Sequence, residues 1–184
     1  MGLSQIQEAP EQLEIVREFL NTWRIPNDTR KQVDELHTID DVFQFMRKHF
    51  DEEFFFGTLD EIKQFRDDVR FAIEEKETLQ KWFEKYPFGV CVTENMEFIT
   101  YEPTGGRNFY TMMLQIILNA IDQKWWKRLK ACPDCRWVFY DHSRNGSKRW
   151  CGMYAGSKEG RACGTIAKVK NYREKRKGRS SYTV

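Results

Sequence analysis

Long hydrophobic runs are missing from this sequence of 184 residues. Its longest apolar-rich stretch, residues 109–121, is shorter than the roughly 20 residues that a membrane-spanning helix needs. The beginning of the sequence also lacks a basic segment followed by an apolar one, which is the pattern of a secretory leader. These absences exclude a membrane-spanning protein and make a cytoplasmic location the expectation.

Histidine is scarce as well, with three in the whole chain, of which His37 and His49 precede residue 128. Nothing in the sequence ties either one to a nucleophile, so no catalytic set of residues stands out. Internal repeats are also absent. The expected function is therefore binding, and an enzyme is the disfavoured alternative.

Cysteine is rare before residue 128, where Cys91 is the only one. It lies between two valines in an apolar run that is typical of a strand. A small apolar side chain in that position suits a core, so we expect Cys91 to be buried, inert and dispensable for metal binding.

What is present before residue 128 predicts a packed, mostly helical body, because 40% of the chain is hydrophobic and 15% is aromatic. Apolar residues recur at helical spacing over residues 11–23, 38–50, 58–87 and 109–120. Thr38 can cap the second of these helices, and Thr58 can cap the third by accepting from the N–H of Glu61. Alternating residues around 90–101 predict a β-hairpin. The expected fold class is α+β.

Charge divides the chain at the same place. Residues 1–127 hold 15 Lys and Arg against 24 Asp and Glu, a net charge of −9. Residues 128–184 hold 15 against 4, a net charge of +11. Such asymmetry predicts an acidic domain over 1–127 and a basic one over 128–184 with a polyanionic partner, the alternative being a solvated lysine-rich tail.

Four cysteines lie in the basic segment, at Cys132, Cys135, Cys151 and Cys163. The two-residue gap between the first pair lets one tight turn present two thiolates to a metal, and four thiolates favour Zn²⁺ in a closed structural site. A redox pair would need a thioredoxin-like setting that is missing here. His142 is the alternative ligand if Cys163 is out of place.

Further signals in this segment predict a small treble-clef-like finger. An aromatic run over 136–140, then Asn145-Gly146, then residues 148–150 is typical of a hairpin, and residues 165–177 have helical character. Its cations are candidates for nucleic-acid binding. Arg144 and Arg149 suit base edges, and the remaining candidates suit phosphates: Lys148, Lys168, Lys170, Arg173, Arg176 and Lys177.

The finger resembles the CGNR zinc finger in a long series of motifs: Cys132-Pro-Asp-Cys135, Trp137 to Asp141, Ser143 to Gly146, Lys148 to Met153, and Ala167 to Arg173. The body resembles the associated ABATE domain more loosely, in residues 18–22, 39–45 and 65–70. The resemblance implies a bacterial, nucleoid-associated transcription regulator, with a finger that binds double-stranded DNA and a body that senses an unknown small effector or stress signal.

Two departures from the family pattern stand out. The gap between Cys151 and Cys163 is longer than usual, and Thr165-Ile166 replaces the Asn-Arg that normally follows the last Cys-Gly. Asn21 and Thr22 are candidate ligand-binding residues in the body, with local capping as the alternative. RNA binding and protein interaction remain open as alternatives to DNA binding. Homodimer formation remains open as an addition to any of these functions.

Overall fold

Five α-helices and three two-stranded antiparallel sheets make up the part of the chain that the computed structural model describes, residues 8–75, 79–92, 99–152, 162–165, 168–169 and 172–173. In chain order the elements are α1 (Leu13–Asn21), β1 (Trp23–Arg24), β2 (Val33–Asp34), α2 (Ile39–His49), α3 (Leu59–Glu75), α4 (Gln80–Lys85), β3 (Phe88–Val92), β4 (Ile99–Pro103), α5 (Phe109–Asp122), a 3-10 turn η1 (Trp126–Arg128), β5 (Leu129–Ala131) and β6 (Val138–Tyr140). The predicted α+β class is confirmed. Among these helices, none is long and apolar enough to cross a bilayer.

Helix starts follow the capping signals of the sequence. The Thr38 hydroxyl accepts from the backbone N–H of Asp41, and the Asp41 carboxylate accepts in return from the N–H of Thr38. The Thr58 hydroxyl accepts from the N–H of Glu61 at 3.2 Å. Each bond satisfies a donor that the first helical turn would otherwise leave unpaired, so both predicted caps are confirmed.

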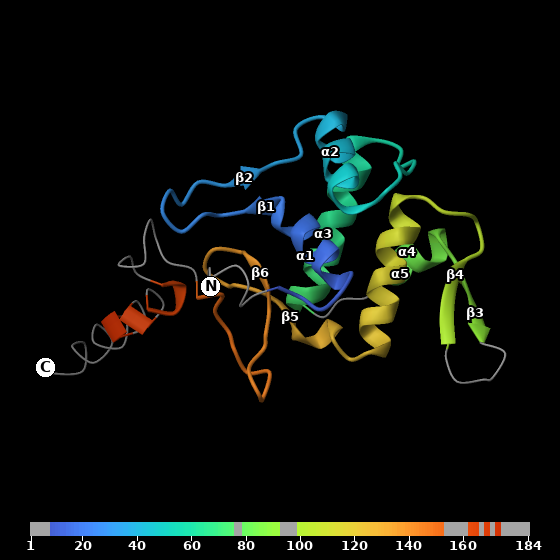
Figure 1. The fold of residues 1–184 in the computed structure, drawn as a ribbon. Helices are drawn as coiled ribbons and strands as arrows, with labels where there is room; N and C mark the ends of the chain where they lie inside the picture. The colour runs from blue at the N-terminus through green and yellow to red at the C-terminus, as the bar shows by residue number, and fades with distance from the viewer. Residues whose placement is uncertain are drawn as a thin grey trace, which may run out of the picture.

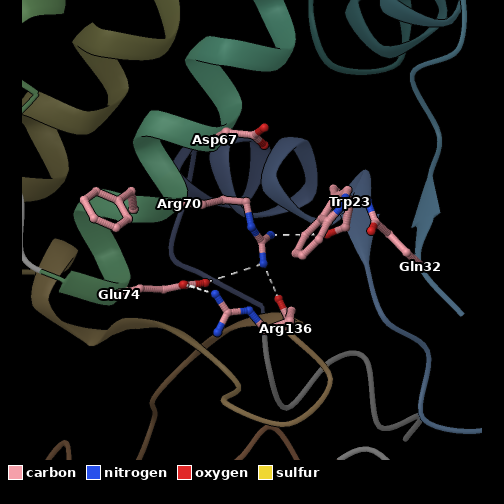
Figure 2. Close-up of a pocket in the computed structure, with 7 residues that line it drawn as sticks. Trp23, Gln32, Asp67, Arg70, Glu74 and Arg136 are labelled. Atoms are coloured by element: carbon pink, nitrogen blue, oxygen red, sulfur yellow. Dashed lines mark hydrogen bonds and ion pairs between the residues drawn. The ribbon is translucent and has the colours of Figure 1, made fainter. Parts of the chain in front are cut away.

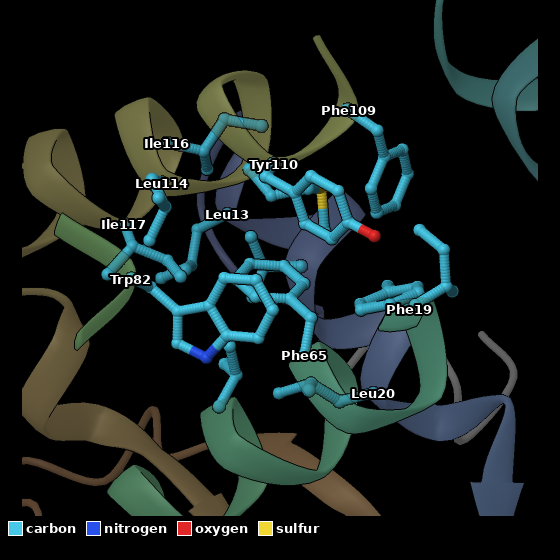
Figure 3. Packing of buried hydrophobic residues seen from close by; sticks show 14 of the residues in the cluster. Leu13, Phe19, Leu20, Phe65, Trp82, Phe109, Tyr110, Leu114, Ile116 and Ile117 are labelled. Atoms are coloured by element: carbon cyan, nitrogen blue, oxygen red, sulfur yellow. The ribbon is translucent and has the colours of Figure 1, made fainter. Parts of the chain in front are cut away.

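The core of the body is built where α1, α3, α4 and α5 meet (Figure 3). The ring of Phe19 on α1 lies 6.1 Å from Phe65 on α3 and 5.3 Å from Phe109 on α5, measured between centroids. Trp82 of α4 stacks on Tyr110 at 5.3 Å. Such aromatic pairs add to the stabilisation that burial alone gives.

The helix expected over 58–87 is two helices instead. α3 ends at Glu75 and α4 begins at Gln80. The Trp82 indole N–H donates to Asp68 on α3 at 2.8 Å, and the Trp82 side chain is buried. A continuous helix would carry this large ring away from Tyr110, so burial of Trp82 favours the break. The first helix is also shorter than expected, because Trp23 belongs to β1.

Cys91 was expected to be buried, and that prediction is wrong because its side chain is exposed. The hairpin itself is confirmed, with Cys91 opposite Thr100 and Val90 opposite Tyr101. Its turn, residues 93–98, lies outside the described residues. The hairpin extends from one end of the body (Figure 1), so the far part of β3 has no layer to pack against. Alternation of apolar residues identifies a strand but not what covers it.

Candidate metal centre

A tight turn between β5 and β6 presents the first pair of thiols. The N–H of Cys132 donates to the carbonyl of Trp137 at 2.8 Å, and the N–H of Arg136 donates to the carbonyl of Cys132 at 2.9 Å. Arg136 takes a left-handed conformation, with φ of 61°. We call residues 131–138 the knuckle. Its fold places the side chains of Cys132 and Cys135 on the same side of the turn.

The other two thiols close the cluster. All four sulfur atoms, from Cys132, Cys135, Cys151 and Cys163, lie within 4.8 Å of one another and are buried. Cys135 and Cys151 are separated by 3.4 Å, and Cys151 and Cys163 by 3.8 Å. A tetrahedral zinc with bonds of about 2.3 Å holds its sulfurs about 3.8 Å apart, so the cluster fits this ion. The predicted cofactor is confirmed as a four-cysteine zinc site.

Electrostatics within the cluster also call for a cation. Hydrogen bonding to Cys135 and to the other two thiols lowers the pKa of Cys132, whereas hydrogen bonds to Cys132 and the others raise the pKa of Cys163. Four buried thiolates would repel one another strongly, and a divalent ion at their centre removes this conflict. A bound zinc would supply folding energy and no open position for chemistry.

The hairpin predicted around Asn145-Gly146 is wrong in its strands, because β6 pairs with β5 and not with residues 148–150. Asn145-Gly146 does form a turn, in which the N–H of Gly146 donates to the carbonyl of Ser143 and Gly146 has φ of 59°. The aromatic strand β6 therefore finds its partner before the first cysteine, and residues 141–150 fold around a buried carboxylate.

That carboxylate belongs to Asp141, whose side chain is 0% exposed. It accepts from the ammonium of Lys130 at 2.7 Å and from the N–H groups of Ser143 at 2.9 Å and Lys148 at 2.8 Å. Burial alone would raise the pKa of Asp141, but these hydrogen bonds outweigh it and lower that pKa to about 2. Lys130 also donates to the carbonyls of Gly146 and Lys148, so one ion pair holds the whole segment.

Helical conformation resumes at 163–165, 168–169 and 172–173, so the last cysteine stands at a helix start as predicted. Gly164 packs under Trp150, since a Cβ on Gly164 would lie 3.1 Å from the nearest ring atom. Any larger residue would push Trp150 away from the cluster. A glycine directly after Cys163 is therefore favoured by packing against Trp150, which the spacing of the cysteines alone does not reveal.

The body is attached to the knuckle by hydrogen bonds to the backbone of the knuckle. Asn21 of α1 accepts from the N–H of Val138 at 2.7 Å and donates to the carbonyl of Val138 at 2.8 Å. The N–H of Ile25 donates to the carbonyl of Cys135 at 3.0 Å. Arg30 donates to the backbone and side chain of Asp134 at 3.2 and 2.9 Å. The metal site is therefore anchored to the body and does not hang from a linker.

Three charged side chains complete this junction (Figure 2). Arg70 of α3 donates to the carbonyl of Arg136, and the Arg136 guanidinium pairs with Glu74 one turn further along α3. Arg70 also donates to the carbonyls of Leu20 at 2.7 Å and Trp23 at 3.2 Å. Burial lowers the pKa of Arg70 to about 10, and the guanidinium remains charged at neutral pH. These bonds offset the strain of the left-handed Arg136.

The candidate ligand residues Asn21 and Thr22 have internal roles. Both are buried, and the Thr22 hydroxyl donates to the carbonyl of Phe19 at 2.7 Å and accepts from Arg66 at 3.1 Å. Thr22 thus stands at the C-terminal cap of α1 and Asn21 joins body and finger, while ligand binding by either residue stays a prediction. His142 lies outside the sulfur cluster, and its ring bonds to the carbonyl of Glu8 at 2.7 Å.

The candidate nucleic-acid residues that the structure describes lie on the surface of the finger. Arg144, Arg149, Lys168 and Arg173 are exposed, and Lys148 is half-buried. The remaining candidates, Lys170, Arg176 and Lys177, lie outside the described residues. Lys148 lies 5.5 Å from the ring of Phe139 and Arg149 lies 5.6 Å from the ring of Trp150, measured to the centroids.

Residue patterns did not reveal the roles of Lys130, Asp141, Arg70 and Asn21. Asp141 offered one signal, because it and Asp134 are the only acids between residues 128 and 152. An isolated acid in a basic segment is a candidate for a buried ion pair. Asn21 and Arg70 offered none, because their partners are 117 and 66 residues away.

Comparison with known proteins bears on the finger alone. No curated protein matches the chain. The likeness of the body to the ABATE domain therefore stays a prediction. The segment that matches a family model contains the knuckle, all four metal ligands and the helical residues that follow Cys163. Residues 128–176 of this chain match the model of the CGNR zinc finger family.

Proposed function

We propose that this chain is a transcription regulator whose zinc-stabilised finger binds double-stranded DNA, and that it is a binding protein and not an enzyme. The observation that carries the proposal is a set of finger cations without acidic partners. Within the described ranges, no carboxylate lies in ion-pair distance of Arg144, Lys148, Arg149, Lys168 or Arg173. A polyanion would supply the missing counter-charge.

Cations of the body differ, because many of them are already neutralised. Exposed examples are the pairs Arg47–Glu53, Lys48–Glu18 and Arg107–Glu52. Among the described cations of the body, only Lys31, Lys124 and Lys127 have no carboxylate within ion-pair distance, whereas the five described candidates of the finger all lack one. This distribution favours a nucleic-acid surface over a uniformly solvated one.

A shallow cavity beside the knuckle is a candidate binding site for the phosphate backbone of DNA. Its lining includes Lys130, Lys148, Arg149, Ile73 and Pro133, together with Glu74, whose carboxylate is already paired with Arg136. Lys130 is held by Asp141, which leaves Lys148 and Arg149 to meet a phosphate. Arg149 is also the candidate for a guanine edge, because its planar fork can donate two parallel hydrogen bonds.

The test uses the full, zinc-loaded chain and fluorescence anisotropy with duplex DNA, at several salt concentrations. The variant Arg144→Gln/Lys148→Gln/Arg149→Gln should weaken binding and reduce the salt slope by about 2–3, one for each lost contact. The matched control is Arg47→Gln/Lys48→Gln/Arg107→Gln, which removes the same charge from the body. It should bind almost as the wild type does.

Two results would overturn DNA binding through this surface. One is equal binding by the finger variant and the wild type, and the other is binding that does not depend on salt. Tighter binding to single-stranded RNA of the same sequence would favour the RNA alternative, because the exposed Tyr172 and the half-buried Trp150 beside Arg149 suit stacked bases. Binding to neither would favour a protein-interaction module with an acidic partner.

We also propose an effector site, on the basis of a cavity of about 340 Å³ at the junction of body and knuckle (Figure 2). Trp23, Gln32 and Phe71 of the body line it together with Arg136 of the knuckle. A ligand there would contact both parts and would bias the finger through Arg136. Thermal-shift screening of metabolites against wild type and Phe71→Ala tests this, since a true ligand should stabilise only the wild type.

A further inference from the structure

The loop that joins β1 to β2 contacts the knuckle of the metal site. We call residues 23–34, which comprise the two strands and this loop, the arm. The N–H of Ile25 donates to the carbonyl of Cys135 at 3.0 Å. Arg30 donates to the carbonyl and to the carboxylate of Asp134. Figure 1 shows the arm on the same side of the molecule as the C-terminal helical residues, and away from the hairpin of β3 and β4.

Hydrogen bonds within the body fix the shape of the arm. β1 and β2 pair over two residues each. The N–H of Glu35 donates to the carbonyl of Thr22 at 2.8 Å, next to these pairs. Within the loop, the N–H of Arg30 donates to the carbonyl of Pro26 at 3.0 Å. The arm is therefore pre-organised, and little conformational entropy would be lost when it binds a partner.

The charge of the loop differs from the charge of the body around it. Residues 25–32 hold Arg30 and Lys31 against Asp28, a net charge of +1 in a body of −9. Lys31 is exposed, and within the described residues no carboxylate lies in ion-pair distance of it. Arg30 pairs with Asp134 at 2.9 Å, and that partner belongs to the finger. Neither cation is therefore neutralised by the acidic body in the described part of the chain.

The pairing of Asp134 with Arg30 bears on the shallow cavity beside the knuckle. Asp134 is the only acid of the knuckle, and its neighbour Pro133 lines this cavity together with Lys148 and Arg149. An unpaired carboxylate next to the cavity would repel a phosphate. Arg30 supplies the counter-charge to this carboxylate, so the arm favours an anion at the finger.

We propose that the arm binds the phosphate backbone of double-stranded DNA beside the finger, with Lys31 contacting a phosphate and Arg30 neutralising Asp134. This inference rests on the proposed DNA binding by the finger and extends that surface onto the body. The arm lies outside residues 128–176, the segment that matches the zinc finger family. Its contacts would position the duplex and add affinity without reading the base sequence.

The chemistry of the exposed loop favours a phosphate backbone over an acidic protein. Residues 28–32 are all exposed and all polar. The core of a protein–protein interface is rich in aromatic residues and poor in lysine, which is the opposite composition. Phosphate oxygens accept hydrogen bonds from lysine, threonine and glutamine side chains, and Thr29, Lys31 and Gln32 offer one of each.

The first test removes the unpaired cation of the arm. Duplex binding by the full, zinc-loaded chain is measured by fluorescence anisotropy at several salt concentrations. Lys31→Gln should make the salt slope shallower by about one, because each phosphate contact releases about 0.9 counterion. A contact whose contribution vanishes near 1 M salt is worth a factor of about eight at 0.1 M, so affinity should fall by about that factor there.

The second test adds a cation, which separates DNA contact from a structural role of the arm. Thr29→Lys should make the salt slope steeper by about one and tighten binding, and a loop that only supports the fold would give no such gain. The matched control is Thr100→Lys, which adds the same charge at an exposed position of β4. That hairpin lies at the other end of the molecule (Figure 1), so the control should keep the wild-type slope.

The third test concerns the neutralising role of Arg30. Arg30→Gln should weaken duplex binding, because it leaves the carboxylate of Asp134 unpaired beside the cavity. Arg30→Gln/Asp134→Asn should recover part of this loss, since no charge then remains at the pair. Metal analysis of each variant should show full zinc, which separates a loss of DNA contact from damage to the metal site.

The outcomes distinguish this inference from the proposed function. Unchanged slopes for Lys31→Gln and Thr29→Lys, with weaker binding by the finger variant Arg144→Gln/Lys148→Gln/Arg149→Gln, would overturn the arm and leave DNA binding by the finger in place. Equal gains from Thr29→Lys and Thr100→Lys would also overturn it, because net charge alone would explain them. A wild type that does not bind duplex DNA would overturn both.

Discussion

Asp141 is the residue on which the segment after β6 depends. Its buried carboxylate receives three hydrogen bonds, one of them from the charged Lys130. A buried ion pair is costly to form, but removing one partner is costlier because the other charge stays buried. The side chain therefore stabilises the segment only while it is ionised.

Asp141→Asn should lower the free energy of unfolding by about 3 kcal/mol at neutral pH, because Lys130 loses its counter-charge. The folded-state pKa is about 2, below the unfolded value of about 3.9. The contribution is thus complete above about pH 4 and declines as the pH falls toward about 2. Denaturant unfolding of both proteins across this range, at saturating zinc, measures the difference. A gap that does not narrow in acid would contradict this role.

The Asn21 side chain hydrogen-bonds both backbone groups of Val138, as a neighbouring strand would. Asn21→Ala should cost about 2–3 kcal/mol of stability, because it leaves a buried N–H without a partner and a carbonyl with only one donor. Asn21→Asp keeps the acceptor but loses the donor, so it should not restore stability. Unfolding without any added ligand provides the measurement. Unchanged stability would contradict this structural role and would favour the prediction that Asn21 binds a ligand.

At the scale of elements, the metal ties the knuckle to the segment that contains Cys151 and to the helical residues after Cys163. Wild-type protein should contain one zinc per chain, and Cys163→Ser should contain much less, because apparent binding of about 10–16 kcal/mol is also folding energy. Metal analysis by mass spectrometry is the measurement. Cys91→Ser is the matched control and should keep full zinc. Equal zinc in Cys163→Ser would remove Cys163 from the site.

Element boundaries were predictable where the signal is local. The caps at Thr38 and Thr58 depend on residues three positions apart, and the hairpin of β3 and β4 on alternation and turn residues. The partner of β6 was not predictable in this way. Asn-Gly favours a hairpin between β6 and residues 148–150, but Asp141 captures the N–H of Lys148 and so removes that segment from the sheet.

For the whole molecule, body and finger share one hydrophobic core. Leu129, Val138 and Tyr140 are 3%, 0% and 5% exposed and pack in the same cluster as α1 and α5. Charge and family likeness both change near residue 128, whereas packing does not. The division into domains at residue 127 stays a prediction, and its test is whether the first part folds alone.

A fragment ending at residue 127 should lose cooperative folding, since it lacks three core side chains and leaves Asn21 and Arg70 without their knuckle partners. Near-UV circular dichroism and chemical-shift dispersion, compared with the full chain, provide the measurement. In the full chain, Leu129→Ala should cost about 2–5 kcal/mol. A fragment with the dispersion and cooperativity of the intact protein would show an autonomous body.

The sequence by itself determined the metal ligands, the opposite charges of the two segments and the helical regions of the body, but not the break between α3 and α4. Each of these depends on residue type and short spacing, which the chain carries wherever it folds. Only the tertiary structure decided that Asn21 holds Val138, that Arg70 holds Arg136 and that Cys91 is exposed. These outcomes depend on which distant segment packs against each residue, or on whether any does. Close packing of the whole molecule decides this.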